Sequence, residues 1–171
     1  LWDGLTHRPL TESPPARATI ARPARELWIL HPRGEPLPVG TPPERVQVLL
    51  LDGSWRESVP MAHTVASGGL LVRLPAAGPS RNALRRQENA GQYSTVEALL
   101  FLLAALGLAG AETSLRQQFE LHVYAGLRTR GAKALAAEFL ATSSLREAFP
   151  DLMQELDRRR PNQDRQGKLG L

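Results

Sequence analysis

The sequence contains no cysteine. This absence excludes disulfide bonds, thiolate metal ligands and a cysteine nucleophile. It also agrees with a reducing compartment, so we expect a cytoplasmic protein. The four histidines, at positions 7, 31, 63 and 122, show no metal-ligand spacing, and we therefore expect no metal in this chain.

Long apolar runs and the common cofactor motifs are missing as well. The longest apolar run, Ala98–Leu106, is far shorter than a membrane span, and no charged-then-apolar export signal opens the chain. We therefore expect no membrane partner. Aromatic residues make up only 5% of the chain, which predicts a core made mostly of Leu, Ala and Val. No P-loop, GxGxxG or HExxH pattern is present.

What is present suits one folded domain with a basic surface. The chain has 171 residues, of which 42% are hydrophobic, and it carries a net charge of +4. We expect an irregular N-terminal arm over 1–25, an α/β domain over 26–158 and a polar tail over 159–171. The basic balance suits a nucleic-acid partner without establishing one, and the sequence leaves the oligomeric state open.

The pattern along the chain predicts a small, mostly parallel sheet flanked by helices, with a helical C-terminal part. Apolar runs predict strands over Glu26–His31, Arg45–Leu51 and Leu70–Leu74. The Pro-rich segment 35–44 is expected to be loop. Helices are expected over 55–66, 94–108, 114–130, 132–140 and 145–158. The helix over 94–108 is apolar nearly all round, so we expect it to be buried, and Gly107 and Gly110 to end it.

The segment LDGSWRES places two candidate site residues after the clearest strand. In parallel sheets, ligands bind beyond the carboxyl ends of the strands, where Asp52 falls. Its carboxylate is a candidate general base or a candidate ligand-binding group for a hydroxyl or ammonium. The alternative is that Asp52 is only the polar residue of an Asp-Gly turn. Trp55 is either a flat wall against a ligand, able to face a cation, or an ordinary core residue. Ser54 and Glu57 have the S-x-x-E spacing of a helix capping box.

The long polar segment 75–93 concentrates Arg81, Arg85 and Arg86. Guanidinium groups bind phosphate or carboxylate oxygens, although such a loop can also be simply solvated. Glu97 follows Ser94 at capping-box spacing, and we assign it to helix capping rather than to acid catalysis.

Three motifs in order resemble the DTW-domain family, over about residues 27–108. They are Asp52, Ser54 and Trp55; then Ser80, Arg81, Leu84 and Arg85; then Ser94, Thr95, Glu97 and Ala98. The resemblance implies a tRNA-uridine aminocarboxypropyltransferase. Such an enzyme moves the 3-amino-3-carboxypropyl group of S-adenosylmethionine to N3 of a tRNA uridine. It also implies a SPOUT-like fold with the cofactor in a knotted region.

The resemblance assigns roles to particular residues. Asp52 is expected either to act as the general base toward uridine N3 or to hold the ammonium of the donor. The expected cofactor-binding residues are Trp55, Ser58, Leu74, Tyr93 and Ser94. The expected RNA-binding residues are Ser80, Arg81, Arg85 and Arg86, of which the arginines would meet tRNA phosphates or the donor carboxylate.

The chain departs from the family in two respects. The family usually carries N-terminal cysteines that look zinc-binding, so the chain is either truncated or from a zinc-free branch. Asn82 stands where an aromatic residue is common. Two other functions remain open: a related S-adenosylmethionine-dependent transferase that acts on rRNA or transfers a methyl group, and a non-catalytic RNA-binding module.

Overall fold

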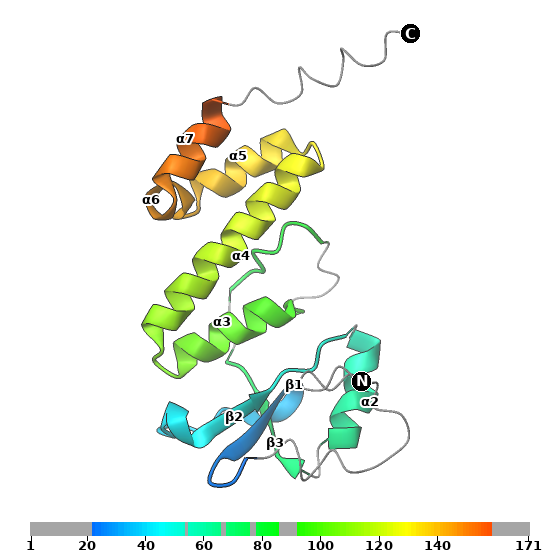
Figure 1. The fold of residues 1–171 in the computed structure, drawn as a ribbon. Coiled ribbons are helices and arrows are strands. Elements are labelled where there is room, and N and C mark those ends of the chain that lie inside the picture. Colours follow the sequence, from blue (N-terminus) through cyan, green and yellow to red (C-terminus); the bar gives the residue numbers. More distant parts are fainter. Residues whose placement is uncertain (1–21, 54, 66–67, 76–77, 86–91, 159–171) are drawn as a thin grey trace.

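The structure is a computed structural model and describes residues 22–53, 55–65, 68–75, 78–85 and 92–158. At one end of the molecule lies a sheet of three parallel strands, β1 (Glu26–Pro36), β2 (Val46–Leu49) and β3 (Leu70–Arg73), in the order β2-β1-β3. Helix α2 (Trp55–Val65) connects β2 to β3 and lies beside this sheet (Figure 1). The predicted parallel α/β architecture is therefore confirmed.

The central strand β1 is longer than expected because it contains a large bulge. Both Leu30 and Glu35 pair with Val72, so residues 31–34 leave the regular ladder before the strand rejoins β3. Gly34 lies directly on the neighbouring backbone, since a Cβ there would be 2.6 Å from main-chain atoms of Leu71 and Val72. Our prediction that the Pro-rich segment from Glu35 is all loop is therefore wrong at its two ends.

Those ends are ordered in different ways. Glu35 and Pro36 continue β1, while Pro43–Arg45 forms a short 3-10 helix, η1, that leads into β2. Strand β2 is correspondingly shorter than predicted, because its pairing with β1 ends where Ile29 meets Leu49.

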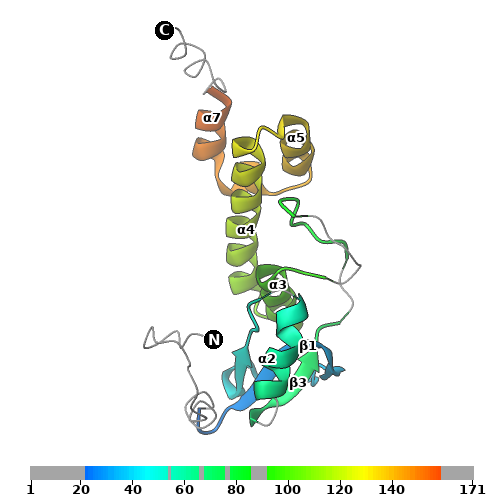
Figure 2. The same cartoon turned by 90° about the vertical axis from the view of Figure 1, so that its right-hand side faces the viewer.

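The second half of the described chain is helical. It contains α3 (Thr95–Ala105), α4 (Ala109–Thr129), α5 (Lys133–Ala141), α6 (Leu145–Ala148) and α7 (Pro150–Arg158). Helix α3 lies between the sheet and α4, and α5 and α7 flank the far end of α4 (Figures 1 and 2). Nine buried side chains of this half form one core: Leu100, Phe119, Val123, Tyr124, Leu127, Ala136, Phe139, Leu145 and Met153.

Four helix predictions need correction. Helix α4 begins at Ala109, well before the predicted start at 114. Gly107 does end α3, with φ of +71°, but Gly110 lies in the first turn of α4 rather than terminating a helix. The segment 145–158 is two helices, because Pro150 disfavours helical geometry at the preceding residue, Phe149. Helix α3 is not buried all round: Val96 is 38% exposed, because the described elements cover only part of its circumference.

A second, smaller core lies in the sheet and consists of Trp28, Val46 and Val72, with Leu106 from the end of α3 packed against it. The two cores are thus joined through α3. No helix in the described ranges is both long and apolar enough to cross a membrane.

Candidate active site

Asp52 lies just beyond the carboxyl end of β2, as the sequence predicted, and it is exposed. The hydroxyl of Thr95, the first residue of α3, donates a hydrogen bond of 2.8 Å to its Oδ1 atom. The first and third motifs, 43 residues apart, therefore meet at this edge of the sheet. Trp55 begins α2 three residues later, while its side chain and Ser54 lie outside the described part of the chain.

Glu97 binds the second and third motifs together. Its Oε1 accepts hydrogen bonds from the Ser80 hydroxyl and the Arg81 backbone N–H, each at 2.8 Å, and a longer one from the Asn82 N–H. Its Oε2 accepts hydrogen bonds from the backbone N–H and the hydroxyl of Ser94. The Ser94 hydroxyl in turn accepts from the Glu97 N–H, so the predicted capping box is confirmed.

The pKa of Glu97 reflects two opposed causes. The residue is only 2% exposed, and this burial by itself raises the pKa of the carboxyl group. The hydrogen bonds from Ser94, Ser80 and Arg81 favour the ionised form and outweigh the burial, so that the pKa is lowered from its usual value. Glu97 is therefore a charged structural centre with its oxygens directed at the protein itself.

Arg81 points into the helical half of the molecule. Its Nε lies 3.1 Å from Oε1 of Glu120, a carboxylate on α4 whose side chain is only 5% exposed. Its guanidinium donates to the carbonyl of Thr142 and lies over the Phe139 ring, 4.9 Å from the ring centre. This position anchors the loop to α4 and α5, and we assign Arg81 a structural role there.

Leu84 anchors the same loop a turn later. It packs into the helical core, and the space it occupies exists because residue 126 is glycine: a Cβ there would lie 2.6 Å from a Leu84 methyl carbon. The guanidinium of Arg130 donates to the Leu84 carbonyl. Arg85 is exposed, and Arg86 lies outside the described residues.

The residues predicted to hold the cofactor are found in different surroundings. Leu74 follows β3 and is half-buried, and Ser58 lies in α2. The Tyr93 hydroxyl donates to the Gly78 carbonyl, and its ring meets that of Phe101 edge-on at 4.7 Å. Ser94 is the N-cap of α3. Their predicted roles toward a cofactor, and those of Ser80 and Arg81 toward RNA, stay predictions.

Two contacts of the motif residues were not predicted from the sequence. Thr95 belongs to the third motif but had no predicted role of its own, and its hydroxyl donates the hydrogen bond to Asp52. Glu120 was not singled out, although a charge between the apolar positions Phe119 and Val123 is a signal for a buried, paired carboxylate. The sequence can therefore indicate that Glu120 is buried and paired, but it does not show that the partner is Arg81.

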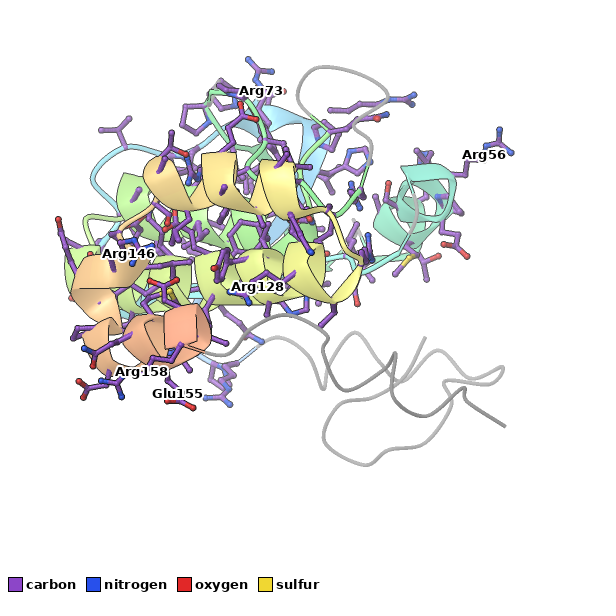
Figure 3. The ribbon with its side chains drawn as sticks, turned by 90° about the horizontal axis from the view of Figure 1, so that it is seen from above. Arg56, Arg73, Arg128, Arg146, Glu155 and Arg158 are labelled. Carbon is purple, nitrogen blue, oxygen red and sulfur yellow. The ribbon has the colours of Figure 1, made fainter. Side chains whose placement is uncertain are left out.

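Three of the exposed arginines lie on different sides of the described molecule. Figure 3 shows Arg56 projecting from α2 at one side, whereas Arg146 and Arg158 lie near α6 and α7 on the other. Arg146 forms a salt bridge of 2.9 Å with Asp157. No group of three or more His, Asp or Glu side chains in the described segments is arranged to hold a metal ion.

The fold is that of an α/β protein with a three-stranded parallel sheet, and its candidate site contains a carboxylate just beyond the carboxyl end of one strand. The sequence model of the DTW domain matches residues 5–125, which is more than half of the chain. The chain belongs to the DTW-domain family. No curated protein and no solved structure matches it.

Proposed function

We propose that this protein is a tRNA-uridine aminocarboxypropyltransferase that uses S-adenosylmethionine as donor. Membership of the DTW-domain family supports the proposal. The observation that carries it is the meeting of Asp52 and Thr95, because two family motifs thereby join at a strand edge where ligands of parallel sheets bind. A SPOUT-like relationship and a cytoplasmic location belong to the same proposal.

The reaction needs a deprotonated nucleophile and a good leaving group. Uridine N3 loses its proton and forms a bond to the γ-carbon of the donor. The bond between that carbon and the sulfonium sulfur breaks, and methylthioadenosine leaves with the electron pair. Asp52 accepts the N3 proton in this scheme, which a general base accelerates by ~10²–10⁴-fold.

The residues at this edge fit the amino-acid end of the donor. The Thr95 hydroxyl occupies Oδ1 of Asp52, and the exposed carboxylate keeps acceptor capacity for an ammonium group or for the N3 proton. Trp55, Ser58, Leu74, Tyr93 and Ser94 would surround the rest of the donor. We propose that Arg85 and Arg86 bind tRNA phosphates, since the guanidinium of Arg81 is engaged by Glu120.

The decisive experiment is mass spectrometry of nucleosides from bulk tRNA of a deletion strain, with the gene restored as control. We expect loss of the aminocarboxypropyl-uridine nucleoside and its return on complementation. Complete retention in a strain without a paralogue contradicts the proposal. Reconstitution with purified protein separates the alternatives, because methyl transfer yields a different product mass and a passive RNA-binding module yields no product.

Asp52→Asn tests the assigned chemistry. If Asp52 is the base, the variant loses transfer while calorimetry shows donor binding unchanged. If Asp52 instead holds the donor ammonium, donor affinity falls as well. If Asp52→Asn transfers the group at nearly the wild-type rate, Asp52 is neither the general base nor the group that binds the donor ammonium.

A further inference from the structure

A small open hollow lies beside the bulged part of β1, away from the Glu97 network. It has a volume of about 110 Å³ and is lined by His31, Arg33, Val59, Ala62, His63 and Leu71. His31 and Arg33 lie within the bulge of β1, Val59 and His63 come from α2, and Leu71 comes from β3. Bulges of this kind redirect side chains and are frequent beside functional sites.

The imidazole of His31 has a hydrogen-bonding group with no partner in the described structure. The residue is only 6% exposed, and its Nδ1 accepts a hydrogen bond of 3.2 Å from the backbone N–H of Arg33. In the neutral ring the proton is therefore on Nε2, which makes Nε2 a donor. Nε2 is buried and makes no hydrogen bond to any described residue. The indole Nε1 of Trp28 is also buried without a partner, but of these two donors only His31 lines the hollow, where a bound acceptor could satisfy it.

The surroundings of His31 disfavour a positive charge on its ring. Burial, then Arg33, then His63 lower the pKa of His31, so both neighbours oppose a charge on this ring. No carboxylate among the described residues forms a salt bridge with Arg33 or His63, and no acidic residue lines the hollow. Arg33 carries a permanent positive charge beside this ring with no salt-bridge partner among the described residues, and a bound anion would offset that charge.

We infer that this hollow is an oxyanion site that receives a phosphate group of the RNA substrate. The inference rests on the proposed function for the identity of the partner. A phosphate offers acceptor oxygens to the planar donor fork of Arg33, and to the Nε2–H of His31 once a rotation of that buried ring turns it toward the hollow. Arg33 and His63 are exposed and the hollow is open, which suits a group carried on a large molecule. The carboxylate of the donor is another oxyanion that could bind here. The second measurement below distinguishes it from an RNA phosphate.

The first measurement uses inorganic phosphate as probe and follows the ring signals of His31 and His63 by NMR. We expect saturable shifts in the wild-type protein, a higher His31 pKa in the presence of phosphate, and much smaller shifts in Arg33→Gln. A wild-type spectrum that does not respond to phosphate overturns the inference. This measurement involves neither tRNA nor the donor, so its failure is separate from any failure of the proposed transferase reaction.

The second measurement compares tRNA binding by Arg33→Gln and Arg45→Gln across salt concentrations. Arg45 is also an exposed arginine and lies at the amino end of β2, at the opposite edge of the sheet. Loss of one phosphate contact lowers the slope of log affinity against log salt by about one unit, and we expect this only for Arg33→Gln. Equal slopes for the two variants, or weaker donor binding with unchanged tRNA binding in Arg33→Gln, overturn the assignment to RNA phosphate.

Discussion

The side chains of Thr95 and Asp52 are joined by a hydrogen bond of 2.8 Å, which connects the start of α3 to the carboxyl end of β2. The Thr95 hydroxyl donates to one carboxylate oxygen and thereby restricts the rotation of the Asp52 side chain. We infer that Thr95 is a positioning residue for the candidate site. Its effect should then be visible in the kinetics and should depend on the hydroxyl group rather than on side-chain volume.

Replacement of Thr95 by alanine should lower the transfer rate by about tenfold, since a hydrogen bond to a charged group contributes about 1.5 kcal/mol. Thr95→Ser retains the hydroxyl and should keep most of the activity. If Asp52 is the base, the loss appears in kcat while the donor dissociation constant is unchanged. If Asp52 holds the donor ammonium, the dissociation constant rises instead. Equal activities of the alanine and serine variants would exclude a positioning role.

Replacement of Arg81 by glutamine should destabilise the fold more than replacement of the exposed Arg85 by the same residue. The first variant leaves the buried carboxylate of Glu120 without its 3.1 Å ion-pair partner, which costs roughly 1–3 kcal/mol. The second removes an exposed side chain, for which changes within about 0.5 kcal/mol are usual. Chemical denaturation measures both. An Arg81→Gln protein as stable as Arg85→Gln would contradict the anchoring role.

Glu97 should make the stability depend on pH in the acidic range. Its pKa is lower in the folded state than in the unfolded chain, where it lies at about 4.3. Its contribution is therefore complete above the unfolded pKa and is lost as the pH falls through the lower folded pKa. Thermal unfolding measured from neutral to acidic pH should show this loss in the wild type and less of it in Glu97→Gln. The exposed Glu138→Gln serves as control, and identical pH profiles for all three proteins would count against this origin.

Substitution of Gly34 by alanine should disrupt the bulge of β1. The added Cβ would lie 2.6 Å from backbone atoms of β3, and backbone cannot move aside as a flexible side chain can. Overpacking of this kind costs about 1–3 kcal/mol. Gly68→Ala is the matched control, because a Cβ there meets nothing within 4 Å. Because Gly34 shares the bulge with His31 and Arg33, the phosphate-dependent NMR shifts should also weaken. A Gly34→Ala protein as stable as the wild type would argue against the close approach of residue 34 to the β3 backbone.

Local patterns in the sequence determined much of this structure. The segment Glu26–His31, with its apolar run from Leu27, predicted a buried strand, and its residues Trp28 and Ile29 are fully buried in the centre of the sheet. The Ser94–Glu97 spacing predicted a capping box, and Asp52 does lie beyond the end of a parallel strand. These features depend on short-range hydrogen bonding and on residue polarity, which neighbouring residues specify.

Only the tertiary structure decided what the polar residues of the motifs contact. The sequence alone did not show that Ser80 and Arg81 contact Glu97 and Glu120, which are 17 and 39 positions away along the chain. The bulge that brings His31 and Arg33 toward α2 likewise depends on how β1 pairs with β3. Sequence specifies the chemistry that each side chain carries. Its partner is set by long-range packing, because segments far apart in the chain must meet before a carboxylate and a guanidinium can pair.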